Sequence, residues 1–231
     1  MRPTVLLFDI DGTLVSTGGA GRRSIERAFL LVHGRADACS HFTFDGMTDR
    51  SIVRLGLQAI GVAADEAAID VLLARYVQCL DEAVQSVPEA QYIVHAGMRE
   101  AVDAGLAAGM AVGLGTGNVR EGARVKLGRV GLFEKFSFGG FGDDHELRPE
   151  LIRLGAERGT QQLGVTLREA RVVVIGDTPK DVAAAQAIGA ESVAVATGGF
   201  TVEQLRASGA TRVFATLADE GGLDAILRPP D

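Results

Sequence analysis

Two carboxylates near the N-terminus, Asp9 and Asp11, are the residues whose types and spacing most directly indicate chemistry. They follow the apolar run Val5-Leu6-Leu7-Phe8, which predicts a short buried strand. Side chains two residues apart in an extended segment point the same way, so both acids are aimed at one small volume. Two carboxylates about 4 Å apart repel by roughly 4 kcal/mol at an effective dielectric constant of about 20. A divalent cation or a shared proton would offset that repulsion. The alternative interpretation of this segment is an ordinary turn at a strand end, without chemistry.

A second acidic pair, Asp177 and Asp181, opens a predicted helix directly after the apolar strand 171–175. A single Asp in that place is usually a helix cap. Beside Asp9 and Asp11, however, the second pair favours a shared cation site. Carboxylate oxygens with few His or Cys nearby favour magnesium (Mg2+). We therefore expect Asp9, Asp11 and Asp177 to bind the metal, and Asp181 to brace the site from behind or to cap its helix.

The elements that must position these residues alternate between helices and continuous apolar strands. After the first strand, the expected strands are residues 110–114, 136–138, 171–175, 192–195 and 211–214, and the expected helices are 98–108, 119–130, 149–163 and 180–188. This alternation predicts an α/β fold, a Rossmann-like doubly wound parallel sheet covered on both faces. Ligands of such sheets bind at the carboxyl ends of the strands, which is where Asp9, Asp177 and Thr116-Gly117-Asn118 fall.

Residues 16–92 interrupt the alternation. The Gly-rich segment 14–21 predicts a flexible loop, helices are expected near residues 25–32, 49–59 and 65–87, and no strand is expected between residues 15 and 89. We therefore expect residues 1–15 and 93–231 to form the α/β core and residues 16–92 to form an inserted all-helical domain.

Composition narrows the function classes. The 231 residues are 47% hydrophobic and 23% charged, as in ordinary globular proteins, and the net charge of −7 argues against nucleic acid or an anionic membrane as a partner. No apolar stretch approaches about 18 residues and no signal segment is recognisable, so we expect a cytoplasmic protein. Cys39 and Cys79 lack metal-ligand spacing and are expected to be reduced thiols. The oligomeric state is left open.

Three ordered motifs give the chain a resemblance to hydrolases of the haloacid dehalogenase superfamily, in the phosphoglycolate-phosphatase-like group with a helical cap. Asp9-Ile10-Asp11-Gly12-Thr13 matches the first motif of that family in full. Thr116 in Gly115-Thr116-Gly117-Asn118 matches the second motif, and the run from Gly176-Asp177 to Asp181 matches the fourth. The resemblance spans essentially the whole chain, with residues 16–92 in the place of the cap.

The resemblance implies a magnesium-dependent phosphatase that hydrolyses a small phosphorylated metabolite, with 2-phosphoglycolate as the leading substrate. Asp9 would attack phosphorus and form an aspartyl-phosphate. Asp11 would protonate the leaving oxygen and then activate water, while its backbone carbonyl binds the metal. Thr116 and the N–H groups that follow it, at Gly117 and Asn118, would hold the phosphoryl oxygens.

The third motif of the family departs from the pattern here. A Lys before a Pro is expected, but the matching place contains Arg148 before Pro149. A guanidinium binds carboxylate and phosphate in a bidentate manner, so Arg148 is the favoured substitute, with Lys126 as the rival. In the predicted cap, Arg22 and Arg50 are candidates to face the substrate, although each alone is more often a surface charge.

Several alternatives remain open. A phosphomutase resembling β-phosphoglucomutase shares every core residue and differs by keeping water from the aspartyl-phosphate. A non-catalytic phosphometabolite-binding protein is a weaker alternative, because it need not keep both Asp9 and Asp11. A dinucleotide-binding protein is disfavoured, since Gly113-Leu114-Gly115-Thr116-Gly117 lacks the next expected Gly and would leave the acidic residues unexplained. Dehalogenation is disfavoured because those relatives do not use the second acid, here Asp11, as the acid or base.

Overall fold

A six-stranded parallel sheet lies at the centre of the computed structural model, which describes residues 2–229. The strands run in the order β5-β4-β1-β6-β7-β8, and each neighbouring pair is parallel. Their bounds are β1 Thr4–Phe8, β4 Ala111–Gly115, β5 Gly139–Gly140, β6 Arg171–Gly176, β7 Glu191–Val195 and β8 Arg212–Phe214. The predicted Rossmann-like doubly wound α/β fold is confirmed.

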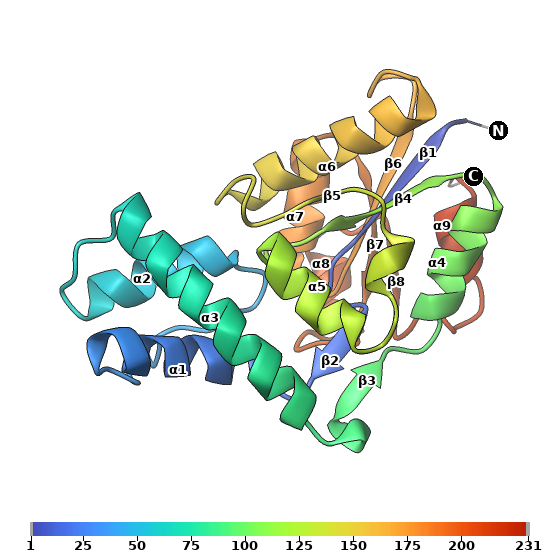
Figure 1. Cartoon of the computed structure of the whole chain (residues 1–231). Coiled ribbons are helices and arrows are strands. Elements are labelled where there is room, and N and C mark those ends of the chain that lie inside the picture. Colours follow the sequence, from blue (N-terminus) through green and yellow to red (C-terminus); the bar gives the residue numbers. More distant parts are fainter. Residues whose placement is uncertain (1, 230–231) are drawn as a thin grey trace.

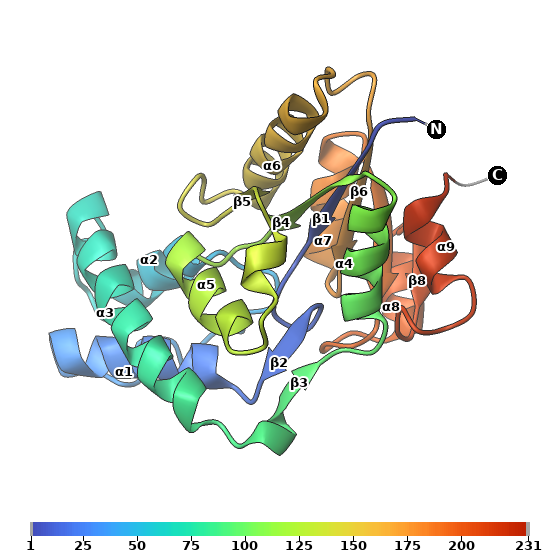
Figure 2. The same ribbon diagram turned by 45° about the vertical axis from the view of Figure 1, so that its right-hand side comes forward.

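Alternate side chains of β1 build two separate hydrophobic layers, because successive residues of a strand point to opposite faces. Val5 and Leu7 pack in the cluster that includes α6 (Arg148–Leu163) and α7 (Pro179–Ala187). Leu6 and Phe8 pack in the cluster on the other face, with α4 (Met98–Ala107), α5 (Arg120–Gly128) and α9 (Gly222–Leu227). The sheet thus lies between two helical layers (Figure 2), and α8 (Val202–Ala207) packs beside β7 and β8.

Three helices, α1 (Ala20–His33), α2 (Asp49–Ala59) and α3 (Glu66–Ser86), form a unit of their own beside the sheet (Figure 1). They enclose a second hydrophobic core that includes Phe29, Leu57, Leu72, Tyr76 and Leu80. Thr48 caps α2 and Asp65 caps α3, each with a side-chain oxygen that accepts a backbone N–H of the first turn. Because α3 lies against α5, this helical unit adjoins the core on the side of α5.

Both connections to the helical unit pass through a small antiparallel ribbon. Strand β2 (Val15–Thr17) pairs with β3 (Tyr92–Val94), so that Thr17 lies opposite Tyr92. The expectation of a flexible loop over residues 14–21, and of no strand after residue 15, was therefore wrong at this point. Three-residue strands have too little alternation to be recognised, and the partner strand lies far along the chain.

Short elements account for the other differences. The strand expected at residues 136–138 lies instead at Gly139–Gly140, where a Cβ on Gly140 would stand 1.8 Å from the Leu151 carbonyl oxygen. Helices α8 and α9 and the 3₁₀ turns Glu89–Gln91 and Phe133–Lys135 were not predicted, because each is too short to show helical periodicity.

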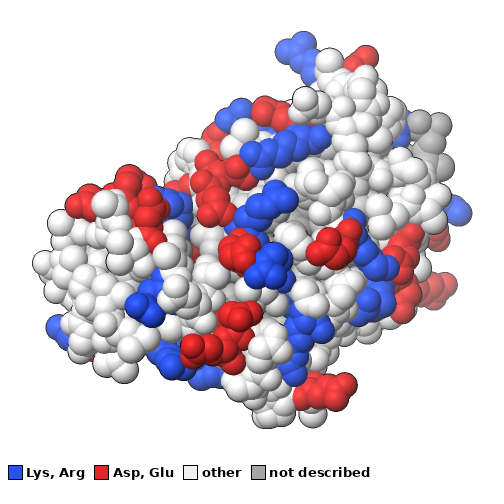
Figure 3. Space-filling model, viewed as in Figure 1, with Lys and Arg blue, Asp and Glu red and all other residues white. Residues whose placement is uncertain are grey.

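The surface in Figure 3 carries acidic and basic side chains interspersed with one another. Exposed ion pairs such as Arg124–Glu121 and Lys135–Asp103 bring opposite charges together. Within residues 2–229, no helix is both long enough and apolar enough to cross a lipid bilayer.

Arg171, at the start of β6, provides a test of how the C-terminal helix is held. Its buried guanidinium donates to the carbonyls of Ala225 and Ile226 and pairs with Glu191 at 2.7 Å. Arg171→Leu removes these donors and should lower the free energy of unfolding by about 3 kcal/mol in urea denaturation. Arg168→Leu, at an exposed position, is the matched control and should stay within about 0.5 kcal/mol. Equal losses in the two variants would contradict this account.

Candidate active site

The carboxyl ends of β4, β1 and β6 meet at one edge of the sheet because these strands are neighbours. In the register of the sheet, Phe8 lies opposite both Leu114 and Ile175. The residues that follow each strand therefore converge, as the sequence predicted. Asp9 and Asp177 come from two of these ends, and Asn118 comes from the turn after β4.

Asp9 and Asp177 form a buried cluster with a third acid, Asp181, which lies in the first turn of α7. One carboxylate oxygen from each of Asp9, Asp177 and Asp181 lies within 4.8 Å of the other two. Burial is the main cause that raises the pKa of Asp9 to about 6 and that of Asp177 to about 8, and neighbouring carboxylates add to both shifts. Hard oxygen donors held this close together suit a divalent cation such as Mg2+, so the residues fit the metal that the family implies.

Arg148 lies inside this cluster rather than on the surface. As the first residue of α6, it places its Nη2 atom 2.9 Å from Asp9 Oδ2 and donates from Nε to Asp181 Oδ1 at 2.9 Å. The positive charge of Arg148 lowers the pKa of Asp9 and so opposes the effect of burial. Asp181 also accepts the Thr178 backbone N–H, which completes the capping box of α7.

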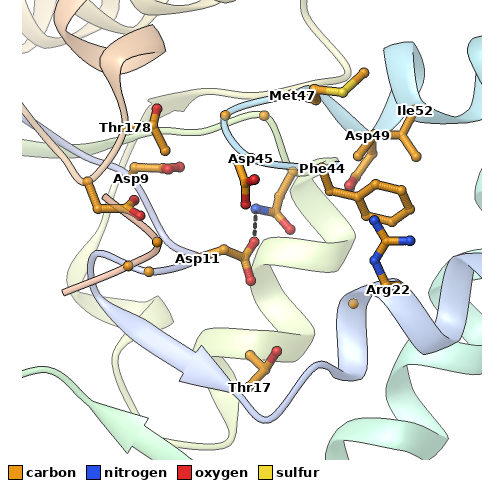
Figure 4. Close-up of a pocket in the computed structure, with 18 of the residues that line it drawn as sticks. Asp9, Asp11, Thr17, Arg22, Phe44, Asp45, Met47, Asp49, Ile52 and Thr178 are labelled. Atoms are coloured by element: carbon orange, nitrogen blue, oxygen red, sulfur yellow. Dashed lines mark hydrogen bonds between the residues drawn. The ribbon is translucent and has the colours of Figure 1, made fainter. Parts of the chain in front are cut away.

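Lys126 lies beside a different aspartate. Its buried Nζ donates to Asp11 Oδ2 at 2.6 Å and to Asn118 Oδ1 at 2.6 Å. Asn118 Nδ2 donates to the same Asp11 oxygen at 2.8 Å, which is the dashed bond in Figure 4. The Asp11 side chain is therefore held apart from the acidic cluster. The sequence presented Arg148 and Lys126 as rivals for one position, but the structure places each beside its own carboxylate.

The structure explains why Gly12 and Thr13 follow Asp11, because both lie against Asp177. Gly12 has a φ of +77°, and a Cβ there would stand 2.4 Å from Asp177 Oδ2. Thr13 donates its hydroxyl to Asp177 Oδ1 at 2.9 Å and so fixes that carboxylate. Across the site, a Cβ on Gly198 would also clash with Asp177. The sequence did not indicate a role for Thr13 or Gly198, and the residues around Gly198 show no local pattern that could have indicated one.

The turn after β4 faces the cavity through Gly117 and Asn118. Thr116 is fully buried, and its Oγ1 accepts hydrogen bonds from the Asn118 backbone N–H at 3.3 Å and from its side-chain amide at 3.0 Å. Thr116 thus lies behind Asn118 and orients it. Among the residues expected to hold phosphoryl oxygens, Gly117 and Asn118 are the ones that line the cavity.

A loop of the helical unit covers the site and encloses a cavity of about 650 Å³. The Asp49 backbone N–H donates to the Gly117 carbonyl at 2.8 Å, and Asp49 Oδ2 accepts the Val119 N–H at 2.9 Å. Nearby, Lys180 donates to the Asp45 carbonyl at 2.9 Å. The helical unit therefore provides one wall of the same cavity, with Phe44, Met47 and Ile52 among its apolar residues (Figure 4).

The two arginines expected in the cap differ in placement. Arg22 lines the cavity, and its guanidinium carbon stacks on the Phe44 ring, 4.0 Å from the ring centre (Figure 4). Arg50 does not line the cavity, because it pairs with Glu66 and with Asp70, the latter at 2.9 Å. Asp49 and Tyr76, which the sequence did not single out, do line it. Neither had a recognisable signal, since each reaches the site only through the packing of α2 and α3.

The fold and the site define a Rossmann-like enzyme with an acidic cluster at the carboxyl edge of its sheet. The chain belongs to the haloacid dehalogenase-like hydrolase family, whose profile matches residues 3–189, and it is therefore a hydrolase. No curated protein sequence matches it.

Solved structures of similar fold cover nearly the whole chain. CbbY from Rhodobacter sphaeroides, in complex with phosphate, has a TM-score of 0.70 at 17% identity and covers 97% of this chain and 100% of its own. A hydrolase from Pseudomonas syringae has a TM-score of 0.67 at 20% identity, with 93% of both chains covered. A predicted phosphoglycolate phosphatase from Haemophilus somnus has a TM-score of 0.66 at 17% identity, covering 95% of this chain and 96% of its own. At these identities the similarity establishes the fold.

The raised pKa values predict how metal and pH act on stability. Between about pH 4 and pH 8 the folded protein binds more protons than the unfolded chain, because the pKa of Asp9 is raised to about 6 and that of Asp177 to about 8. The free energy of unfolding of the metal-free protein should therefore fall as pH rises through this range. A bound cation replaces those protons, so Mg2+ should raise the Tm more at about pH 8.5 than at about pH 5.5.

Thermal unfolding in EDTA and in MgCl2 at both pH values measures this difference. Asp177→Asn should reduce the Mg2+-dependent shift, whereas Asp103→Asn, at an exposed position outside the site, should retain it. An equal or smaller shift at the higher pH would refute the assignment of this cluster as the cation site.

Proposed function

We propose that the protein is a Mg2+-dependent phosphatase that hydrolyses a small phosphorylated metabolite through an aspartyl-phosphate at Asp9. The observation that carries this proposal is the separation of two neighbouring acids. Asp9 lies in the acidic cluster beside Arg148, while Lys126 and Asn118 hold the Asp11 side chain outside it. Nucleophilic attack and proton transfer need two carboxylates in different environments.

The carboxylates of Asp9 and Asp177, with the backbone carbonyl of Asp11, would hold the metal. When bound, Mg2+ supplies positive charge to the transferring phosphoryl group. Arg148 would add positive charge beside the same phosphoryl group, since its guanidinium already contacts Asp9 and is fixed by Asp181. The Gly117 N–H is the proposed donor to a remaining phosphoryl oxygen. The Asn118 N–H would have to leave Thr116 Oγ1, to which it donates at 3.3 Å, before it could serve a second one.

In the first step an Asp9 carboxylate oxygen forms a bond to phosphorus as the bond from phosphorus to the alcohol oxygen breaks. Asp11 gives a proton to the departing alcohol. In the second step Asp11 takes a proton from water, the water oxygen attacks phosphorus, and inorganic phosphate leaves as the Asp9 carboxylate is restored. Lys126 and Asn118 fix the orientation of Asp11 in both steps, because both donate to its Oδ2.

Phosphate release from p-nitrophenyl phosphate tests the proposed function. The purified protein should release phosphate in MgCl2 and lose that activity in excess EDTA, with recovery when Mg2+ is restored. Metal-independent turnover would refute the proposal. Release of an isomerised product from a sugar phosphate, without inorganic phosphate, would favour the phosphomutase alternative.

The two buried cations should affect turnover in different ways. Arg148→Met should lower kcat/KM by about 10²–10³-fold for aryl and alkyl phosphates alike, because it removes a charge beside the nucleophile. Lys126→Met disturbs the proton carrier, so its loss should be about tenfold larger for an alkyl phosphate than for p-nitrophenyl phosphate, whose leaving group departs without a proton. Steady-state kinetics on both substrates measure the contrast. The same loss on both substrates in Lys126→Met would contradict the assigned role.

A further inference from the structure

We infer that Asp49 and Tyr76 form a leaving-group site that selects phosphomonoesters of an uncharged, hydroxyl-bearing alcohol such as a polyol or sugar, and disfavours a leaving group with a carboxylate or second phosphate. The inference rests on the proposed phosphatase function and concerns the half of the cavity that the helical unit provides. It differs from the 2-phosphoglycolate expectation, which came from the family resemblance alone.

Tyr76 supplies an unused hydrogen-bonding group. The residue is 1% exposed and lines the cavity from α3, and its hydroxyl has no hydrogen-bond partner within residues 2–229. A buried hydroxyl without a partner is destabilising, and on a residue that lines the cavity it points to a ligand atom as the missing partner. Burial raises the pKa of Tyr76, and the negative charges of Asp49 and Asp11 add to that shift.

Asp49 supplies an acceptor in the same wall. Its Oδ2 is engaged by the Val119 N–H, which leaves Oδ1 for a ligand. Burial raises the pKa of Asp49 to about 7, and the charge of Lys126 opposes that shift. A hydroxyl can donate to the ionised carboxylate, accept from the protonated one, and pair with Tyr76 in either case. A substrate carboxylate or phosphate would instead meet a like charge whenever Asp49 is ionised.

The cations around the cavity are already committed to other partners. In the part of the chain that the structure describes, the basic residues lining it are Arg22, Lys126 and Arg148. Arg148 contacts Asp9, and Lys126 contacts Asp11. Arg22 is directed to Glu26 at 3.2 Å and to the Phe42 carbonyl at 3.0 Å. A second anionic group on the substrate would therefore find no cation without an existing partner there.

The rest of this wall suits the carbon skeleton of a polyol or sugar. Ile25, Met47 and Ile52 line it, and the Phe44 ring stacks against the Arg22 guanidinium (Figure 4). The cavity volume of about 650 Å³ lies well within the range of small-molecule sites. Apolar walls with a few fixed polar groups are the usual way in which such sites set orientation and specificity.

Glycerol 3-phosphate and 3-phosphoglycerate form a matched pair of probes, because they differ only by a hydroxymethyl group in place of a carboxylate. We expect kcat/KM to be at least about tenfold higher for glycerol 3-phosphate. Asp49→Asn keeps a side-chain oxygen for the Val119 N–H but removes the charge, so it should narrow this preference. Equal rates on the two probes, or a preference for 3-phosphoglycerate, would overturn the inference.

The two tyrosines of the chain allow a matched pair of variants. Tyr76→Phe should lower kcat/KM several-fold more for glycerol 3-phosphate than for ethyl phosphate, whose alkyl leaving group needs the same proton from Asp11 but has no further hydroxyl. Its Tm should hold or rise, because the hydroxyl it removes has no partner in the free protein. Tyr92→Phe removes a hydroxyl that donates to the Lys126 carbonyl at 2.6 Å, so it should lower the Tm and leave the ratio of the two substrates unaltered.

A fall in Tm for Tyr76→Phe as large as that for Tyr92→Phe, or an equal loss on both substrates, would show a structural role and overturn the inference. Hydrolysis of p-nitrophenyl phosphate separates this failure from that of the proposed function. If the aryl phosphate is hydrolysed but the two probes are not distinguished, the inference fails and the phosphatase stands. If it is not hydrolysed in MgCl2, both fail.

Discussion

The mutual repulsion of carboxylates at the ends of β1 and β6 is the constraint on which the site depends. Adjacent parallel strands bring Asp9 and Asp177 together, and the first turn of α7 adds Asp181. All three are buried, so their charges are neither solvated nor separated. Arg148 offsets part of that cost within the protein. The raised pKa values of Asp9 and Asp177 indicate that Arg148 offsets the repulsion only in part. A divalent cation, such as this family generally uses, would supply the positive charge that is still missing.

The same constraint explains why the second acid of the opening pair leaves the cluster. If the Asp11 side chain joined the other three, it would add a fourth negative charge. Lys126 and Asn118 hold it elsewhere, in a position where it can exchange a proton. The helical unit is anchored beside the site through Asp49, whose N–H donates to the Gly117 carbonyl and whose carboxylate accepts the Val119 N–H. Asp49 therefore has two roles, because it attaches the helical unit to the core and also lines the cavity.

The sequence predicted what depends on long periodic segments and on strand ends. The parallel sheet is confirmed, and the helix expected at residues 49–59 coincides with α2. Short elements such as β2 and β5 were missed or misplaced, because two or three residues contain no period. At the site, the sequence located Asp9, Asp177 and Arg148 at strand and helix ends. It could not show that Tyr76 and Asp49 line the cavity, since that follows from how α3 and α2 pack and not from any local pattern.

Covalent labelling of Asp9 tests the central claim most directly. Asp11→Asn retains the nucleophile but lacks the base that activates water, so a phosphoryl group transferred from p-nitrophenyl phosphate in MgCl2 should persist on the protein. Acid quenching, proteolysis and mass spectrometry should then find one phosphoryl group on the peptide that contains Asp9, and none in Asp9→Asn or in EDTA. Turnover by the native protein with no phosphoryl group trapped in Asp11→Asn, or with the group on another residue, would contradict the account.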